Sequence, residues 1–174
     1  MKLVEQGSAQ TLTREQFEVF YGLTMPALRS YICRVSGNEG IADDIVQEAY
    51  IKLLNAPPLL DRQRKSYLYR VATNLVTDYY RVQSRARRWW SQLAGLEEAY
   101  YAGTELTTDV QRLFTMISPR ERALLWLAYV EEAEHRDIAK ILGVKQKSVK
   151  VLLHRTRRKM EEILRKHGFE ASHE

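Results

Sequence analysis

The most specific spacing in this 174-residue sequence lies in residues 137–150. The pattern predicts a short helix with the small residue Ala139 on its inner face, then Gly143, then a second helix with Val149 and Leu153 inward. A small residue lets two helices approach closely, and glycine provides the backbone conformation that a tight turn needs. This is the spacing of a helix-turn-helix, whose second helix enters the DNA major groove.

The outer face of this second helix carries side chains that can recognise duplex DNA. Gln pairs with adenine edges, Lys with guanine or phosphate, and Val with the thymine methyl group. A solvated basic face on an ordinary terminal helix is the alternative, which the helix-turn-helix spacing makes less favoured. The predicted contacts with duplex DNA are Gln146, Lys147, Lys150, Val151, His154, Arg155 and Arg158.

A second basic and aromatic group lies between residues 61 and 85. Rings stack on unpaired bases, Arg holds phosphates, and Asn hydrogen-bonds a base edge, so the group suits single-stranded nucleic acid. Spacing alone favours the alternative, an ordinary solvated helix face. The group comprises the polar loop from Asp61 to Lys65, with Arg62 and Arg64, and the helix face Tyr67, Arg70, Asn74, Asp78, Arg81 and Arg85.

A third polar face lies on a predicted helix over residues 41–56. Asp43 and Asp44 fall in its first turn, where the helix dipole favours anions, and Gln47 and Glu48 continue the same outward face. On spacing alone, an ordinary solvated helix start is the better interpretation of these four residues.

Hydrophobic spacing of three and four residues predicts that the elements carrying these faces are helices almost throughout. Thr13 and Ser118 begin capping boxes, Pro26 is expected to kink the first helix, and a further helix is predicted over 66–88. The predicted fold class is all-α, with two small helical domains joined by a flexible linker. The predicted parts are a tail (1–12), a first domain (13–88), the linker (89–107), a helix-turn-helix domain (108–168) and a second tail (169–174).

Composition narrows the classes of function. A net charge of +5 and a pI near 9.3 favour nucleic acid as partner. Cys33 is the one cysteine, and the four His lack metal-ligand spacing. No glycine-rich phosphate loop and no nucleophile–base signature are present, so we expect no enzyme, cofactor, metal or small-molecule substrate. The apolar runs are short and the first residues lack a leader core, so we expect a cytoplasmic protein without membrane insertion.

Three segments resemble the extracytoplasmic-function sigma factors, the small two-domain promoter-specificity subunits of bacterial RNA polymerase. Residues 42–50 are similar to the family's polymerase-binding segment, 67–81 to its −10 melting and recognition helix, and 137–150 to its −35 helix-turn-helix. They occur in the family's order, and the likeness covers about residues 14–88 and 110–165.

The resemblance implies a role for each polar face. Asp43, Asp44, Gln47 and Glu48 are expected to contact the clamp coiled coil of the largest subunit of core RNA polymerase. The −10 element of promoter DNA is expected to contact Arg62, Arg64, Lys65, Tyr67, Arg70, Asn74, Arg81 and Arg85, and the −35 element the helix-turn-helix residues named above. The implied function is to direct polymerase to promoters, without catalysis by this chain, under control of an anti-sigma factor.

The sequence departs from the family pattern at several positions, and two rival interpretations of its function also stay open. Glu134 and Lys145 stand where Ser or Thr often caps the two helices, and Val151 and Leu152 are expected to be exposed apolar groups. A conventional helix-turn-helix repressor or activator is one rival, and it predicts duplex binding without polymerase. A sigma mimic that titrates a regulator and binds no DNA is the other.

Overall fold

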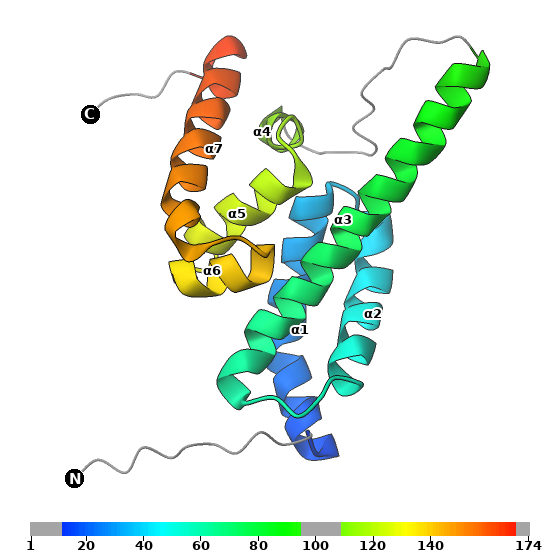
Figure 1. Cartoon of the computed structure of the whole chain (residues 1–174), viewed down its shortest axis with the longest axis vertical. Coiled ribbons are helices and arrows are strands. Elements are labelled where there is room, and N and C mark those ends of the chain that lie inside the picture. The colour runs from blue at the N-terminus through cyan, green and yellow to red at the C-terminus, as the bar shows by residue number, and fades with distance from the viewer. Residues whose placement is uncertain (1–11, 95–108, 170–174) are drawn as a thin grey trace.

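The structure, a computed structural model, describes residues 12–94 and 109–169, and every regular element within these ranges is helical (Figure 1). The predicted all-α fold class is confirmed. The elements are α1 (Arg14–Ser36), the 3₁₀ helix η1 (Glu39–Ile41), α2 (Ala42–Leu54), α3 (Asp61–Ala94), α4 (Asp109–Phe114), α5 (Pro119–Tyr129), α6 (His135–Leu142) and α7 (Gln146–Lys166).

Local capping signals define both ends of α1. The Thr13 hydroxyl accepts a hydrogen bond from the backbone N–H of Gln16 at 3.3 Å, and the Gln16 side chain accepts one from the Thr13 N–H at 3.1 Å. The predicted capping box is therefore present. Gly37 ends the helix in the left-handed conformation, with φ 62°. Pro26 lies inside α1, which runs as one helix on both sides of it.

Helix α3 differs most from its predicted bounds. It begins at Asp61 instead of Ser66 and runs to Ala94, so residues 89–94 of the predicted linker are helical. The Gln63 side chain accepts a hydrogen bond from the Leu60 N–H at 3.2 Å, which stabilises a helix start that the apolar pattern does not mark. The remainder of the predicted linker and most of the predicted tails lie outside the described residues. The division into domains stays a prediction.

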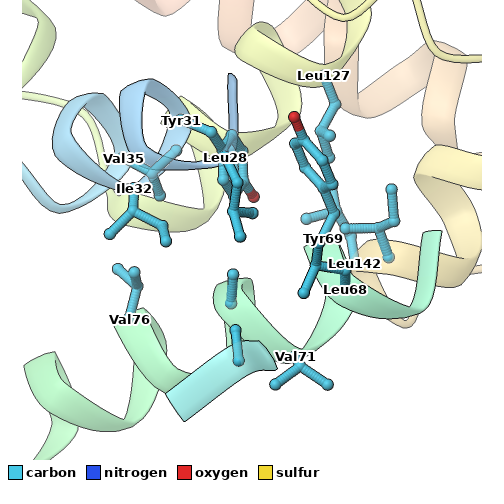
Figure 2. Close-up of a cluster of buried hydrophobic side chains, with 14 of the residues drawn as sticks. Leu28, Tyr31, Ile32, Val35, Leu68, Tyr69, Val71, Val76, Leu127 and Leu142 are labelled. Carbon is cyan, nitrogen blue, oxygen red and sulfur yellow. The ribbon is translucent and has the colours of Figure 1, made fainter. Parts of the chain in front are cut away.

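The first module, residues 12–94, packs α1 and α2 against α3. Leu28, Tyr31 and Ile32 of α1 are fully buried, facing Leu68 and Val76 of α3 (Figure 2). Burial of such side chains contributes about 1.5–3 kcal/mol each to stability. Val82, farther along α3, is 62% exposed. The end of α3 projects beyond α1 and α2 (Figure 1).

The second module, residues 109–169, packs α4 to α7 around buried residues such as Leu124, Leu127 and Ile138. It also packs on the first module: α1 contacts α5, and α3 contacts both α5 and α6 (Figure 1). The buried side chains of both modules form one continuous cluster. The free chain is therefore closed, with two modules that share a core.

Gly37 provides a test of this close approach. A Cβ atom added there would lie 3.0 Å from Thr115 Cγ2 and 3.1 Å from Arg122 Nη1, both in the second module. Gly143 has the same φ of 62° but open space around it. We expect Gly143→Ala to lower the free energy of unfolding by about 1 kcal/mol through backbone strain alone.

We expect Gly37→Ala to cost about 2–4 kcal/mol, since overpacking adds to the strain. Urea denaturation of both variants measures the difference. Equal losses in the two variants would show that the modules do not meet closely at this position.

Candidate polymerase and nucleic-acid surfaces

The acidic surface on α2, defined as Asp43, Asp44, Gln47 and Glu48, is fully outward-facing. All four side chains are exposed, while the opposite side of the helix is anchored by buried residues such as Ile45 and Val46. Asp43 accepts a hydrogen bond from Arg29 Nε at 2.7 Å, and this bond lowers the pKa of the Asp43 carboxyl. The surface therefore offers carboxylates to a basic partner.

Among these four residues, two already have ion-pair partners within the chain. Asp43 pairs with Arg29, and Glu48 lies 3.1 Å from Lys52 Nζ, one helical turn away. Asp44 has no ion pair among the described residues. The carboxylate of Asp44 is accordingly the one on this surface with its full charge open to a partner.

The α3 surface, defined as Arg62, Lys65, Tyr67, Arg70 and Asn74, combines cations with an aromatic ring. Four of the five are exposed, and Tyr67 is half-buried. The Arg70 guanidinium lies 5.2 Å from the centre of the Tyr67 ring, which holds the ring beside a positive charge. This arrangement suits a stacked base next to a phosphate.

Farther along α3, the two remaining predicted contacts, Arg81 and Arg85, are exposed on the polar side of the helix. Arg81 Nη2 lies 3.0 Å from Asp78 Oδ1. This pair is solvent-exposed on both sides and spans one turn, so it contributes little to stability and leaves Arg81 able to exchange its partner.

Arg64 does not fit the role that the resemblance implied. It is 7% exposed and forms an ion pair with Asp61. Nine tenths of its surface is already covered by protein, which leaves no face for a phosphate. Tyr69, on the same helix, is 1% exposed and packs in the core.

The helix-turn-helix forms as its spacing predicts. Gly143 has φ 62° and its N–H donates to the Ala139 carbonyl, which ends α6. Neither Glu134 nor Lys145 makes a side-chain capping hydrogen bond, as their residue types indicated. Arg120, which sequence reasoning missed, donates from Nη2 to the Leu142 carbonyl at 2.7 Å and satisfies the end of α6.

The predicted duplex-DNA contacts on α7 lie on one face of the helix, called the reader face below, and this face is open to solvent. Val151 is 49% exposed, and Leu152, expected to be exposed as well, is instead partly buried against the core. No ion pair within the described residues uses a basic residue of this face. Gln146 is the first residue of α7, so the positive end of the helix dipole adds to the positive potential that the basic side chains create there. The exposed residues of the reader face are Gln146, Lys147, Lys150, Val151, His154, Arg155 and Arg158.

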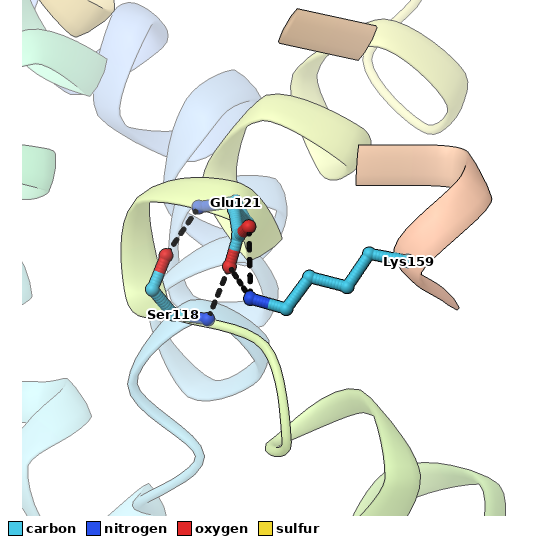
Figure 3. Close-up of polar contacts among 3 residues, drawn as sticks. All are labelled: Ser118, Glu121 and Lys159. Carbon is cyan, nitrogen blue, oxygen red and sulfur yellow. Dashed lines mark hydrogen bonds and ion pairs between the residues drawn. The ribbon is translucent and has the colours of Figure 1, made fainter. Parts of the chain in front are cut away.

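An ion pair fixes the direction of α7. Lys159 Nζ lies 3.0 and 2.9 Å from the two carboxylate oxygens of Glu121, at the start of α5 (Figure 3). The same carboxylate accepts a hydrogen bond from the Ser118 N–H at 2.7 Å. The predicted capping box at Ser118 is thus confirmed, and it is also the anchor of α7, a role that local sequence could not reveal.

Within residues 12–94 and 109–169, neither a metal-binding cluster nor a membrane-spanning helix is present. No group of three or more His, Cys, Asp or Glu side chains is arranged to hold a metal ion in these ranges. No described helix has both the length and the apolar composition needed to cross a bilayer.

Two family models match the chain in the order of the two modules. The model for sigma-70 region 2 matches residues 20–86, and the model for sigma-70 region 4 matches residues 107–160. Together the two matches cover more than two thirds of the chain.

Characterised proteins and a solved structure show the same likeness. The chain is 28% identical over 153 residues to the ECF RNA polymerase sigma factor SigE of Mycolicibacterium smegmatis, covering 80% of this chain and 58% of that protein. It is 29% identical over 149 residues to the ECF RNA polymerase sigma factor SigW of Bacillus subtilis, covering 76% and 80%. The fold is similar to that of the sigma factor RpoE in its complex with the anti-sigma factor NepR from Bartonella quintana. The TM-score is 0.62 and the sequence identity is 21%, and the match covers 87% of this chain and 98% of that one.

The Glu121 anchor predicts a pH dependence. Burial raises the pKa of this carboxyl, but hydrogen bonds from Lys159 and Ser118 outweigh it, so the pKa lies below its ordinary value. A lowered native pKa stabilises the fold above the unfolded-state pKa of about 4.3, and this stabilisation is lost as pH falls through the native pKa.

We expect Glu121→Gln to lower the free energy of unfolding by about 0.5–1 kcal/mol at pH 7, because Gln keeps the capping hydrogen bond and removes the charge. The difference from wild type should shrink below about pH 4.5. Denaturant titrations from pH 3.5 to 7 test this, with Glu161→Gln on the exposed side of α7 as control. A difference that stays constant over this range would contradict the assignment.

Proposed function

The chain belongs to the sigma-70 family of RNA polymerase sigma factors, in its extracytoplasmic-function group, and we propose that it directs core RNA polymerase to specific promoters and initiates transcription there. The observation that carries the proposal is the order of the two matched regions together with three exposed surfaces of suitable chemistry. The chain spans 58% of the SigE relative and 80% of SigW, so the activity of those whole proteins is a proposal for this chain.

Each surface takes one partner in this proposal. The acidic surface on α2 binds the clamp coiled coil of the largest polymerase subunit, through carboxylates that lie outward on a rigid helix. The α3 surface holds the non-template strand of the −10 element, with Arg81 and Arg85 on its backbone. The reader face of α7 enters the major groove of the −35 element.

Promoter opening requires binding energy and no covalent chemistry from this chain. Extruding a base from the stack costs a few kcal/mol, and stacking on an aromatic ring contributes about 1–3 kcal/mol per base. Tyr67 supplies the ring, and the Arg70 guanidinium beside it supplies a phosphate contact. Capture of the flipped base offsets the cost of melting, so the chain acts as a non-catalytic specificity subunit.

The proposal extends to localisation and control. Core polymerase and promoters lie in the bacterial cytoplasm, which is where a chain with these partners acts. The similar sigma factor RpoE is known in complex with an anti-sigma factor, and we extend the same class of regulator to this chain. No cofactor, metal or small-molecule substrate is part of the proposed mechanism.

Charge reversal on α2 tests the polymerase contact. We expect Asp44→Lys to lower affinity for core polymerase at least tenfold, since like charges placed opposite each other in an interface cost several kcal/mol. Promoter-dependent transcripts from core enzyme and a library of genomic fragments should be lost in parallel. Glu161→Lys, an equal charge change on α7, serves as control.

In the same assay, the wild-type chain should produce transcripts that core enzyme alone does not. Absence of any promoter-dependent RNA from all fragments, with active core, would refute the proposed function. Tight duplex binding without polymerase, together with indifference to Asp44→Lys, would favour a conventional repressor or activator.

Salt dependence tests the reader face. We expect Lys150→Ala to weaken duplex promoter binding about fivefold or more and to reduce the slope of log K against log salt by about 1, the effect of one lost phosphate contact. Arg165→Ala, at the distant end of the same helix, should change neither quantity. Fluorescence anisotropy from 50 to 200 mM salt measures both, and identical slopes for Lys150→Ala and wild type would contradict the assignment.

A further inference from the structure

In the closed chain, the second module reaches one edge of the exposed α3 surface, at Lys65. Lys65 Nζ is 3.0 Å from Glu131 Oε2, and the Glu131 side chain is only 10% exposed. Beside this pair is a cavity of about 410 Å³ between α3 and α6. Residues that line it include Arg62, Tyr67 and Arg70 of the α3 surface and Arg136, Asp137 and Lys140 of α6.

The turn between α5 and α6 is acidic. Glu131, Glu132 and Glu134 lie within four residues, and Asp137 follows in the first turn of α6. Arg136 and Lys140 face the two later carboxylates at 3.6–3.9 Å within the second module. Among the carboxylates of this turn, Glu131 is the one that forms an ion pair with α3 in the described part of the chain.

An apolar contact holds the turn in place. Tyr69, one turn after Lys65, lies with Leu127 and Ile141 around a smaller cavity of about 240 Å³ (Figure 2 shows Tyr69 beside Leu127). Lys65 Nζ is also 5.6 Å from the centre of the Tyr69 ring. Burial, with a smaller contribution from the Glu131 charge, raises the pKa of the Tyr69 hydroxyl. The acidic turn therefore lies next to an apolar contact between α3 and the second module.

The packing of the second module on α3 competes with simultaneous binding of the −10 and −35 elements. A carboxylate offers Lys the same acceptor oxygens and negative charge as a DNA phosphate, so Glu131 and a −10 strand compete for one cation. The reader helix α7 begins only three residues after α6, which is packed on α3. The closed chain therefore fixes the start of α7 relative to α3, through α6, whereas promoter elements lie more than one helical turn of DNA, about 35 Å, apart.

We propose that the turn between α5 and α6 is an autoinhibitory phosphate mimic. In the free chain the Glu131 carboxylate pairs with the Lys65 ammonium group, and single-stranded −10 DNA displaces this carboxylate as the modules separate. The proposal rests on the proposed function of the α3 surface. It differs from inhibition by a separate anti-sigma factor because the inhibitory group is in the chain itself.

Binding of single-stranded DNA to the full chain tests the competition. We expect Glu131→Gln to tighten binding of a fluorescent random-sequence single strand about threefold to tenfold, since the strand no longer displaces a carboxylate. Glu132→Gln is the matched control, because it removes the same charge from an exposed neighbour that has no ion pair with α3 in the described ranges. Equal affinities of Glu131→Gln and wild type would overturn the proposal.

Spin-label distances test the opening itself. In a Cys33→Ser background, labels at Val19→Cys on α1 and Glu161→Cys on α7 occupy exposed positions on different modules. We expect one short distance in the free chain, and a longer population in Glu131→Gln and on saturation with single-stranded DNA. A distribution that stays unchanged when DNA is bound would overturn the proposal.

A Tyr67→Ala variant separates failure of this inference from failure of the proposed function. If Tyr67→Ala leaves single-strand affinity unchanged, the α3 surface is not the −10 site, and the autoinhibition falls with it. If Tyr67→Ala weakens binding but Glu131→Gln does not strengthen it, only the autoinhibition is overturned.

Discussion

The contact between α3 and the second module is the constraint on which the rest of the structure depends. Tyr69 and Leu68 are fully buried on α3, and they belong to the same cluster as Leu127 and Leu142 of the second module (Figure 2). Moving such side chains into water costs about 1.5–3 kcal/mol each, so the closed arrangement is a substantial energy minimum. In the proposed function, binding to polymerase and promoter has to supply this energy if the modules are to separate.

Polar groups at the same interface make separation less costly than the apolar area alone indicates. Arg122 is 2% exposed, its guanidinium lies 5.7 Å from the centre of the Tyr80 ring, and its Nε atom has no hydrogen-bond partner in the described structure. A buried cation held by a ring and by the negative end of α1 remains incompletely compensated. Opening returns Arg122 to water, and this gain offsets part of the loss of apolar contact.

The acidic and basic residues of the proposed contacts lie on different helices, each facing a different proposed partner. Carboxylates for the proposed polymerase contact lie on α2, and the cations for the proposed DNA contacts lie on two other helices, α3 and α7. The acidic turn with Glu131 is the exception, because it brings negative charge to the proposed DNA-binding surface of α3. An excess of positive charge in the whole chain is therefore compatible with low affinity for DNA in the closed state.

Local rules predicted the helices, the capping boxes at Thr13 and Ser118, and the helix-turn-helix, because periodicity and caps depend on residues within one or two turns. The exposure of the reader face also followed from the sequence, since the inward positions of one helix define its outward ones. Only the tertiary structure decided that Arg64 is buried and that Lys65 meets Glu131. Partners that lie tens of residues away leave no periodic signal, so the availability of each cation is a property of the packed chain.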